Sequence, residues 1–302
     1  MRVLTTIFSV TILSFVLTAC SPMRFSQYSG SRRFGPVQPE SMAETSFSLP
    51  VYRSWPDRPY ETIGSLRFED PNKYWDDGVI AAAVSGAKSK GGDAIIIRYG
   101  SEFGVSGLAG FGDDPALLRQ NQTTALVIKW KPKSVVEAEV AALRAFKQSF
   151  QAEHPGLCKN ATLLSTAIDS LKWTGASLDS VAADKITGWL TEIGESNHGE
   201  LSGKWLYRCN FKRSQLTSAH SDFFYGMGLV ALKDNVLTVV STSGPTEVNF
   251  SGTFDKGRVT GKMGIAAMSI SCDGVASSEK ISLSGQGQVA DGTFQASLVF
   301  FR

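Results

Sequence analysis

The spacing of apolar and polar residues divides the chain into three folded stretches. The first covers residues 47–132 and contains four short apolar runs, which are typical of strands. These runs are 46–52, 62–68, 94–97 and 124–130. Between the second and third runs, apolar residues recur at helical spacing over 75–87. Asp70 and Pro71 predict the start of this helix and Gly91 its end, so the order of elements predicts a small α/β sandwich.

Residues 133–200 have a helical period and predict a connector of three helices. We expect the helices at 134–153, 161–172 and 178–193. Ser134 and Glu137 have the spacing of a capping box at the start of the first helix. Its apolar face is marked by Val136, Val140, Leu143 and Phe150.

From residue 201 to residue 302, short alternating segments are separated by turns rich in Asp, Asn and Gly. Eight strands are expected: 204–211, 226–232, 236–241, 246–254, 258–266, 268–272, 280–285 and 292–301. Antiparallel strands of this number and length predict a closed barrel or a sandwich. The fold class is therefore α+β: a small α/β sandwich, a helical connector, and an antiparallel β-barrel or β-sandwich of about eight strands.

Two segments resemble known families. Leu201–Trp205 reads LSGKW and is similar to the Gly-x-Trp at the first strand of lipocalin-like barrels. Pro59–Gly64 and Ala87–Ile95 resemble a family of small bacterial α/β domains labelled heavy-metal-binding. That resemblance implies a fold and not a ligand set, because residues 47–132 contain no His and no Cys. We therefore expect no metal site and no cofactor.

The amino-terminal residues have the composition of a secretion signal. Arg2 precedes an apolar run from Val3 to Val16, which is too short to span roughly 30 Å of hydrocarbon as a helix. The sequence Leu17-Thr18-Ala19-Cys20 then resembles the lipobox of bacterial lipoproteins. The resemblance implies that residues 1–19 are removed, and that Cys20 receives a diacylglyceryl thioether and an acyl chain such as palmitate on its new amino group. The alternative is a plain signal peptide that is cut elsewhere.

Ser21 follows the lipidated position, and by resemblance to enterobacterial sorting it favours the outer membrane, with the protein facing the periplasm. Residues 20–46 are rich in Ser, Gln, Pro, Gly and Arg and predict a flexible tether that places the first domain roughly 25–30 Å from the bilayer. Its arginines, Arg24, Arg32 and Arg33, either attract anionic head groups or only keep the tether solvated.

The chain has four cysteines, which suits an oxidising compartment. With Cys20 lipidated, Cys158, Cys209 and Cys272 remain. Cys209 and Cys272 both lie in the strand-rich region, so we expect them to form a disulfide, which would stabilise the fold by roughly 4 kcal/mol. Pairing of Cys158 with either of them is the alternative.

Composition excludes several classes of function. Apolar residues make up 42% of the chain and charged residues 19%, which is typical of folded domains. The net charge of +2 is too low and too dispersed for a nucleic-acid-binding protein. The chain has no HExxH, CxxC, GxSxG or Walker A pattern, and its three histidines lie in loops or near element ends.

One segment could contact a partner. Residues 100–115 alternate glycines with large apolar side chains, notably Phe103, Leu108 and Phe111. Either this segment folds its apolar side chains onto its own domain, or it docks on a partner protein or on lipid.

These observations predict a lipid-anchored lipoprotein of the cell envelope that acts as a non-enzymatic accessory or interaction module in the periplasm. It would contact the membrane through its anchor, and an envelope protein is its expected partner. The alternative is a carrier that holds a small apolar ligand inside the carboxy-terminal β domain. A hydrolase assembled from scattered residues is a third hypothesis.

Overall fold

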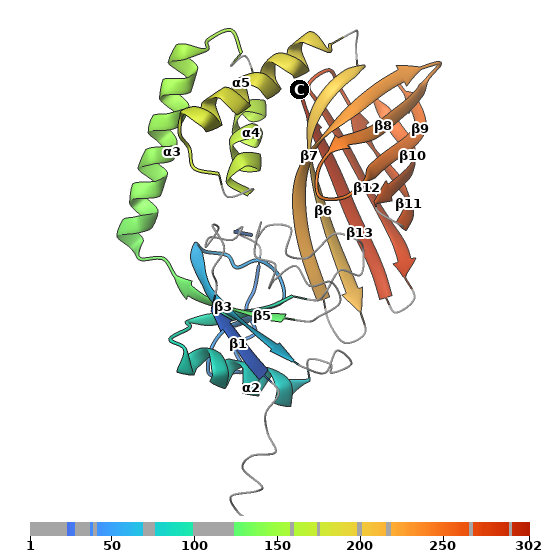
Figure 1. Cartoon of the computed structure of the whole chain (residues 1–302). Helices are drawn as coiled ribbons and strands as arrows, with labels where there is room; N and C mark the ends of the chain where they lie inside the picture. Colours follow the sequence, from blue (N-terminus) through green and yellow to red (C-terminus); the bar gives the residue numbers. More distant parts are fainter. Residues whose placement is uncertain are drawn as a thin grey trace, which may run out of the picture.

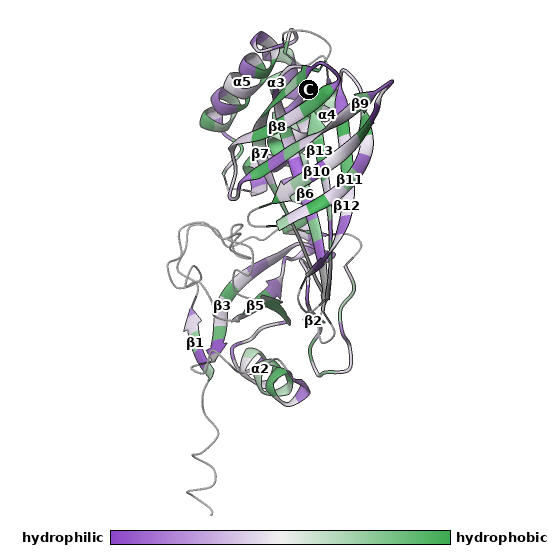
Figure 2. Cartoon of the chain, turned by 90° about the vertical axis from the view of Figure 1, so that its right-hand side faces the viewer, coloured by the Kyte–Doolittle hydropathy of each residue, from purple (hydrophilic) through white to green (hydrophobic). Residues whose placement is uncertain are grey.

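The computed structural model shows two compact parts joined by three helices (Figure 1). It describes residues 23–27, 37–38, 41–68, 76–98, 124–157, 160–173, 176–197, 201–215, 219–265, 268–289 and 292–302. The predicted α+β fold is confirmed, and the carboxy-terminal part is a closed barrel and not a sandwich. In both Figures 1 and 2 the first sheet lies between helix α2 and the barrel.

The first part is a five-stranded sheet with the order β1-β3-β5-β4-β2. Its elements are β1 (Met23–Gln27), β2 (Val51–Tyr52), β3 (Tyr60–Phe68), α2 (Asp77–Ser89), β4 (Ala94–Arg98) and β5 (Thr124–Trp130). Only β2 and β4 pair in parallel. α2 covers one face through Val79, Ile80, Ala83, Val84 and Ala87, which pack against Leu66, Ile95 and Val127. The other face contacts the barrel.

α2 begins later than the sequence predicts. Its first residue is Asp77, and the Asp76 carboxylate caps it by accepting a hydrogen bond from the Val79 backbone N–H at 2.8 Å. The predicted start at Asp70 and Pro71 is therefore wrong, and both residues lie outside the described part. Asp76 supplies the acceptor that the first turn needs, so the helix starts where its cap is.

Strand β1 lies within the stretch that we expected to be a tether. Met23–Gln27 pairs antiparallel with β3, from Met23 opposite Phe68 to Gln27 opposite Gly64. Met23 and Phe25 pack on the side of the sheet that α2 covers. Farther along, the Gln38 N–H donates to the Pro56 carbonyl at 2.8 Å. A flexible tether over all of 20–46 is therefore wrong, because alternate apolar residues attach part of it to the sheet.

The three predicted connector helices are present as α3 (Lys133–Glu153), α4 (Ala161–Trp173) and α5 (Ser180–Glu195). The predicted capping box is wrong, because α3 has Pro132 at its N-cap and no side-chain cap hydrogen bond. Proline fixes φ in a value that suits a helix start, so α3 begins before Ser134. Of the predicted apolar face of α3, Phe150 is buried whereas Val140 is 48% exposed.

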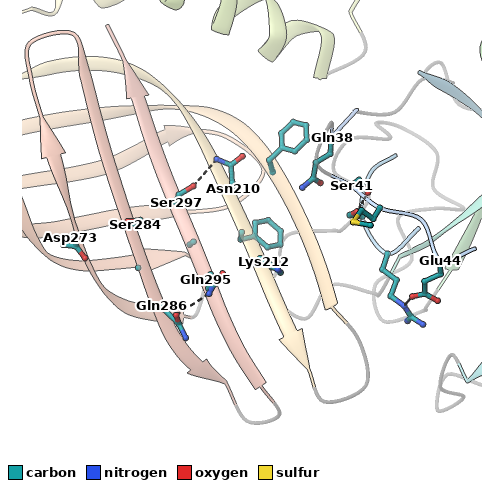
Figure 3. A pocket seen from close by; sticks show the side chains of 17 residues that line it. Gln38, Ser41, Glu44, Asn210, Lys212, Asp273, Ser284, Gln286, Gln295 and Ser297 are labelled. Atoms are coloured by element: carbon teal, nitrogen blue, oxygen red, sulfur yellow. Dashed lines mark hydrogen bonds and ion pairs between the residues drawn. The ribbon is translucent and has the colours of Figure 1, made fainter. Parts of the chain in front are cut away.

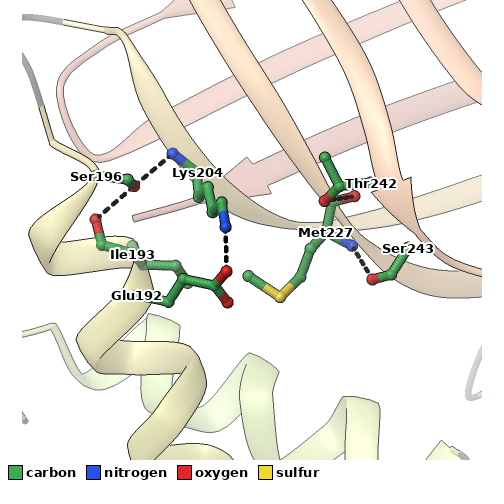
Figure 4. Close-up of polar contacts among 7 residues, drawn as sticks. All are labelled: Glu192, Ile193, Ser196, Lys204, Met227, Thr242 and Ser243. Carbon is green, nitrogen blue, oxygen red and sulfur yellow. Dashed lines mark hydrogen bonds and ion pairs between the residues drawn. The ribbon is translucent and has the colours of Figure 1, made fainter.

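Helices α4 and α5 pack on the outer wall of the barrel, where Leu206 and Met227 join their apolar core. Polar contacts hold the carboxy-terminal end of α5 against the first strand of the barrel (Figure 4). The Ser196 hydroxyl donates to the Ile193 carbonyl at 3.1 Å and accepts from the Lys204 N–H at 2.7 Å. The Lys204 ammonium forms an ion pair with Glu192. The helices therefore form one unit with the barrel.

The barrel contains eight strands, each paired antiparallel with the next in sequence, and it closes by pairing the last with the first. The strands are β6 (Gly203–Gln215), β7 (Ala219–Lys233), β8 (Val236–Ser243), β9 (Val248–Asp255), β10 (Arg258–Ile265), β11 (Met268–Ala276), β12 (Lys280–Val289) and β13 (Gly292–Phe301). All eight predicted strands are confirmed. Polar and apolar residues are interspersed along them (Figure 2), as expected when alternate side chains face the interior.

Side chains fill the interior of the barrel. Its core cluster includes Trp205, Tyr207, Phe224, Phe294 and Phe300, and no member of the cluster is more than 8% exposed. An enclosed cavity large enough for a lipid would leave several of these side chains accessible to a solvent probe. The interior is therefore a packed core, as eight-stranded barrels can have.

The two barrel cysteines do not form the predicted disulfide. Cys209 and Cys272 are both free and buried. Cys209 lies on β6 and Cys272 on β11, and strands β12 and β13 separate them. Three strand spacings place them roughly 14 Å apart along the wall, whereas a disulfide needs Cα atoms within about 7 Å. Each thiol packs as a small apolar side chain in the core.

Candidate functional site

A groove of about 900 Å³ lies between the first part and the outer wall of the barrel (Figure 3). Residues between Gln38 and Ser54 form one side. The other side, its floor, consists of residues on four adjacent strands, β6, β13, β12 and β11, most of them outward-facing. The site therefore depends on both parts of the molecule.

The strand register arranges the floor in two rows of polar side chains. In the first row, Asn210 is opposite Ser297, Ser297 opposite Ser284, and Ser284 opposite Asp273. This row crosses three strand spacings, roughly 14 Å. The Asn210 amide donates to the Ser297 hydroxyl at 3.2 Å, so the row is internally ordered.

The second row lies two residues farther along the strands. Lys212 is opposite Gln295, and Gln295 is opposite Gln286. The Gln295 amide donates to the Gln286 carbonyl oxygen at 3.3 Å. The two rows thus consist of amides and hydroxyls, with one basic and one acidic side chain.

Hydrogen bonds and an ion pair hold the opposite side of the groove. The Arg53 guanidinium binds the Glu44 carboxylate, and the Ser41 and Ser54 hydroxyls are hydrogen-bonded to each other. The backbone of Glu44 is joined to that of Val51 by two hydrogen bonds of 2.8 and 3.1 Å. Because these residues bind one another, this side keeps its shape without a ligand.

An aromatic cluster stands at one end of the groove, where the first part, helix α4 and the barrel meet. Phe223 lines the groove, and the Arg208 guanidinium carbon lies 4.4 Å from the centre of its ring. Tyr225 stands 6.0 Å from Phe223 and 6.2 Å from Trp173 of α4, both edge-on. Burial raises the pKa of Tyr225 to about 12. This cluster fixes the position of the first part on the barrel.

The charged side chains of the groove are few and balanced. Its lining includes two acidic and two basic side chains, and the rest are neutral. None of the lining residues is a histidine or a cysteine. In the part of the chain that the structure describes, no three His, Cys, Asp or Glu residues are grouped as a metal site would require.

The sequence did not reveal this groove. The candidate contact residues Phe103, Leu108 and Phe111 lie outside the described residues, as does the lipidation candidate Cys20. The polar floor residues could be recognised only as the solvent-facing half of alternating strands. Their pairing with residues 38–54 depends on tertiary structure, for which the sequence has no local signal.

The lipocalin-like segment lies at the end of the barrel near the carboxyl terminus. The Trp205 indole N–H donates to the Leu201 carbonyl at 3.0 Å, and Gly203 has a φ of 140°. The Arg302 guanidinium carbon lies 4.6 Å from the centre of the Trp205 ring. The guanidinium nitrogens donate to the Ser202 carbonyl at 3.2 Å and the Ser278 carbonyl at 3.1 Å, so Arg302 holds three chain segments together.

No helix among the described segments has the length and apolar character needed to cross a bilayer.

Comparison with known proteins does not assign the chain to a family. No family model matches it, and no curated protein matches it significantly. The solved structure of the ywiB protein from Bacillus subtilis superposes on 36% of this chain and 96% of its own, with 9% identity and a TM-score of 0.23. A score this low supports no conclusion about fold or function.

Proposed function

We propose that this protein is a lipid-anchored lipoprotein of the cell envelope that acts as a non-enzymatic interaction module and binds its partner in the groove. The lipobox-like residues before Cys20 support the anchor, and Ser21 supports an outer-membrane location facing the periplasm. The observation that carries the binding role is the groove itself: a preformed site about 900 Å³ in volume, lined by polar and apolar surface, to which both parts of the molecule contribute.

The chemistry of the groove indicates what the partner presents there. Amides and hydroxyls both donate and accept hydrogen bonds, and the opposite charges balance. A surface that carries both hydrogen-bonding groups and apolar side chains therefore fits better than a nucleic acid, because Met42, Phe211 and Phe223 line the groove beside the amides and hydroxyls. The carrier hypothesis has less support, because the described side chains of the core cluster are buried against one another inside the barrel.

The groove is tested by in vivo photo-cross-linking from the position of Gln286, which is exposed on its floor. We expect a discrete adduct that disappears when Ser284→Arg places a long side chain in the floor. The matched control is Ser251→Arg, an exposed serine on β9, on another part of the barrel wall. If Ser284→Arg leaves the adduct intact, or if both variants reduce it equally, the groove is not the binding site.

The anchor and the carrier hypothesis have separate tests. Labelled palmitate should be incorporated into the natural chain and not into Cys20→Ser, which should leave the membrane fraction. A fluorescent fatty acid should show no saturable binding to the natural protein. Saturable binding at one site per chain would instead favour the carrier.

A further inference from the structure

The folded domain begins very close to the lipidation candidate. Met23, the first residue of β1, lies three positions after Cys20. Three residues span at most about 11 Å even when fully extended. If Cys20 is acylated, the start of β1 at Met23 must therefore lie within about that distance of the backbone of Cys20.

β1 is firmly attached to the domain, so its position fixes that of the whole first part. All five of its residues pair with β3. At Gly64 of β3 the approach is so close that an added Cβ would lie 2.3 Å from the Phe25 ring and 2.7 Å from the Ser26 carbonyl oxygen. On the same side, the Lys90 ammonium lies 5.2 Å from the centre of the Phe25 ring.

Basic side chains surround this strand. Lys88 and Lys90 are exposed at the carboxy-terminal end of α2, on one side of β1. Arg24 is exposed, and its neighbours in β1 face α2, so its own side chain lies toward the other side of the sheet. The acidic Asp76 and Asp77 lie at the opposite end of α2, roughly 20 Å away along a 13-residue helix.

We propose that β1 and the carboxy-terminal end of α2 form a membrane-facing surface, with Lys88 and Lys90 in contact with anionic lipid head groups. This inference rests on the proposed acylation of Cys20. It assigns an orientation: the sheet lies between α2 and the barrel (Figures 1 and 2), so the barrel and the groove face away from the bilayer. Near a charged bilayer each basic residue strengthens binding about fivefold.

The test measures how close two sites on the acylated mature chain lie to the bilayer. A fluorophore is attached at Ser89→Cys in α2 or at Ser278→Cys in the turn after β11, in a chain that carries Cys158→Ser. Both serines are exposed, whereas Cys209 and Cys272 are buried. The protein is reconstituted into vesicles of phosphatidylethanolamine and phosphatidylglycerol in which a fraction of the lipid carries a head-group nitroxide quencher.

We expect strong quenching at Ser89→Cys and little at Ser278→Cys. Inserting twenty Gly/Ser residues after Ser21 should weaken the quenching at Ser89→Cys, because such a linker reaches roughly 25 Å. Lys88→Gln with Lys90→Gln should weaken it in anionic vesicles and have little effect in neutral ones. The insertion leaves every contact of the folded domain in place, so its result does not depend on how a substitution affects folding.

The outcomes separate this inference from the proposed function. If the protein fails to float with the vesicles, the anchor itself is wrong. If it floats, but Ser89→Cys is quenched no more than Ser278→Cys, the anchor holds and the membrane-facing surface is wrong. Unchanged quenching after the insertion would also overturn the proposed surface.

Discussion

The hydroxyl oxygen of Tyr207 occupies the space that a side chain at Gly226 would need: a Cβ built on Gly226 would lie 2.5 Å from it. The same Cβ would lie 2.3 Å from the Ser243 carbonyl oxygen, which accepts the Tyr207 hydroxyl at 3.3 Å. Neighbouring atoms therefore contact the backbone of Gly226 directly and leave no space for a side chain there.

Gly226→Ala should lower the free energy of unfolding by about 1–3 kcal/mol, because the backbone or the Tyr207 ring must move. Urea denaturation followed by circular dichroism measures the change. Gly188→Ala is the matched control: it lies within α5 and its Cβ would meet no atom within 4 Å. It should raise stability by about 1 kcal/mol through helix propensity. Equal stability of both variants would contradict tight packing at Tyr207.

Arg302 should contribute strongly to stability although it is the last residue of the chain. Arg302→Ala removes the contact with Trp205 and two hydrogen bonds to backbone carbonyls, so we expect a loss of about 1–3 kcal/mol. Arg302→Lys should restore only part of it, because an ammonium lacks the planar fork. Arg258→Ala, at an exposed barrel position, should change stability by less than about 0.5 kcal/mol. A similar loss in both alanine variants would refute a special role for Arg302.

The thiols of Cys209 and Cys272 should react slowly in the native protein. Burial raises the pKa of both, that of Cys272 to about 11 with a further contribution from Asp273, so neither forms a thiolate at neutral pH. With iodoacetamide at pH 8, peptides containing these residues should stay unmodified until guanidinium unfolds the chain. A peptide pair linked through the two cysteines would show that the disulfide forms after all.

Stability should fall above pH 10 partly because of Tyr225. Its pKa is about 12 in the folded state, raised by burial, and about 10 in the unfolded chain, so the unfolded state loses the proton first. Fewer protons on the unfolded state mean that the free energy of unfolding decreases between pH 10 and 12. Tyr225→Phe should flatten this decrease, as measured by urea titrations at several pH values. An unchanged slope would show that Tyr225 titrates normally.

The sequence predicted the elements well where the signal is local. Alternation in segments such as Ile281–Ser284 identified the barrel strands, because one face of each strand packs in the barrel core and the other faces outward. It could not distinguish a barrel from a sandwich, since closure depends on the pairing of β13 with β6, about ninety residues apart. The same limit explains the wrong disulfide: Cys209 and Cys272 belong to the same strand-rich region of the sequence but lie three strand spacings apart in the wall.

The candidate site was less accessible to sequence reasoning. Its floor residues, such as Ser284 and Gln295, look like any solvent-facing residues of a strand. Only the fold brings Ser41 and Ser54 opposite them. β1 was missed for a related reason, because five residues with two apolar side chains are too few to distinguish a strand from a polar linker.

Closure by the final strand has a consequence for how the molecule is made. β13 is made after all the strands it pairs with, and until it is in place both β6 and β12 have an unpaired edge. A product shortened by a premature stop codon would keep those edges open and could pair with other chains. The finished barrel has no open edge, so this route to association exists only while the chain is incomplete.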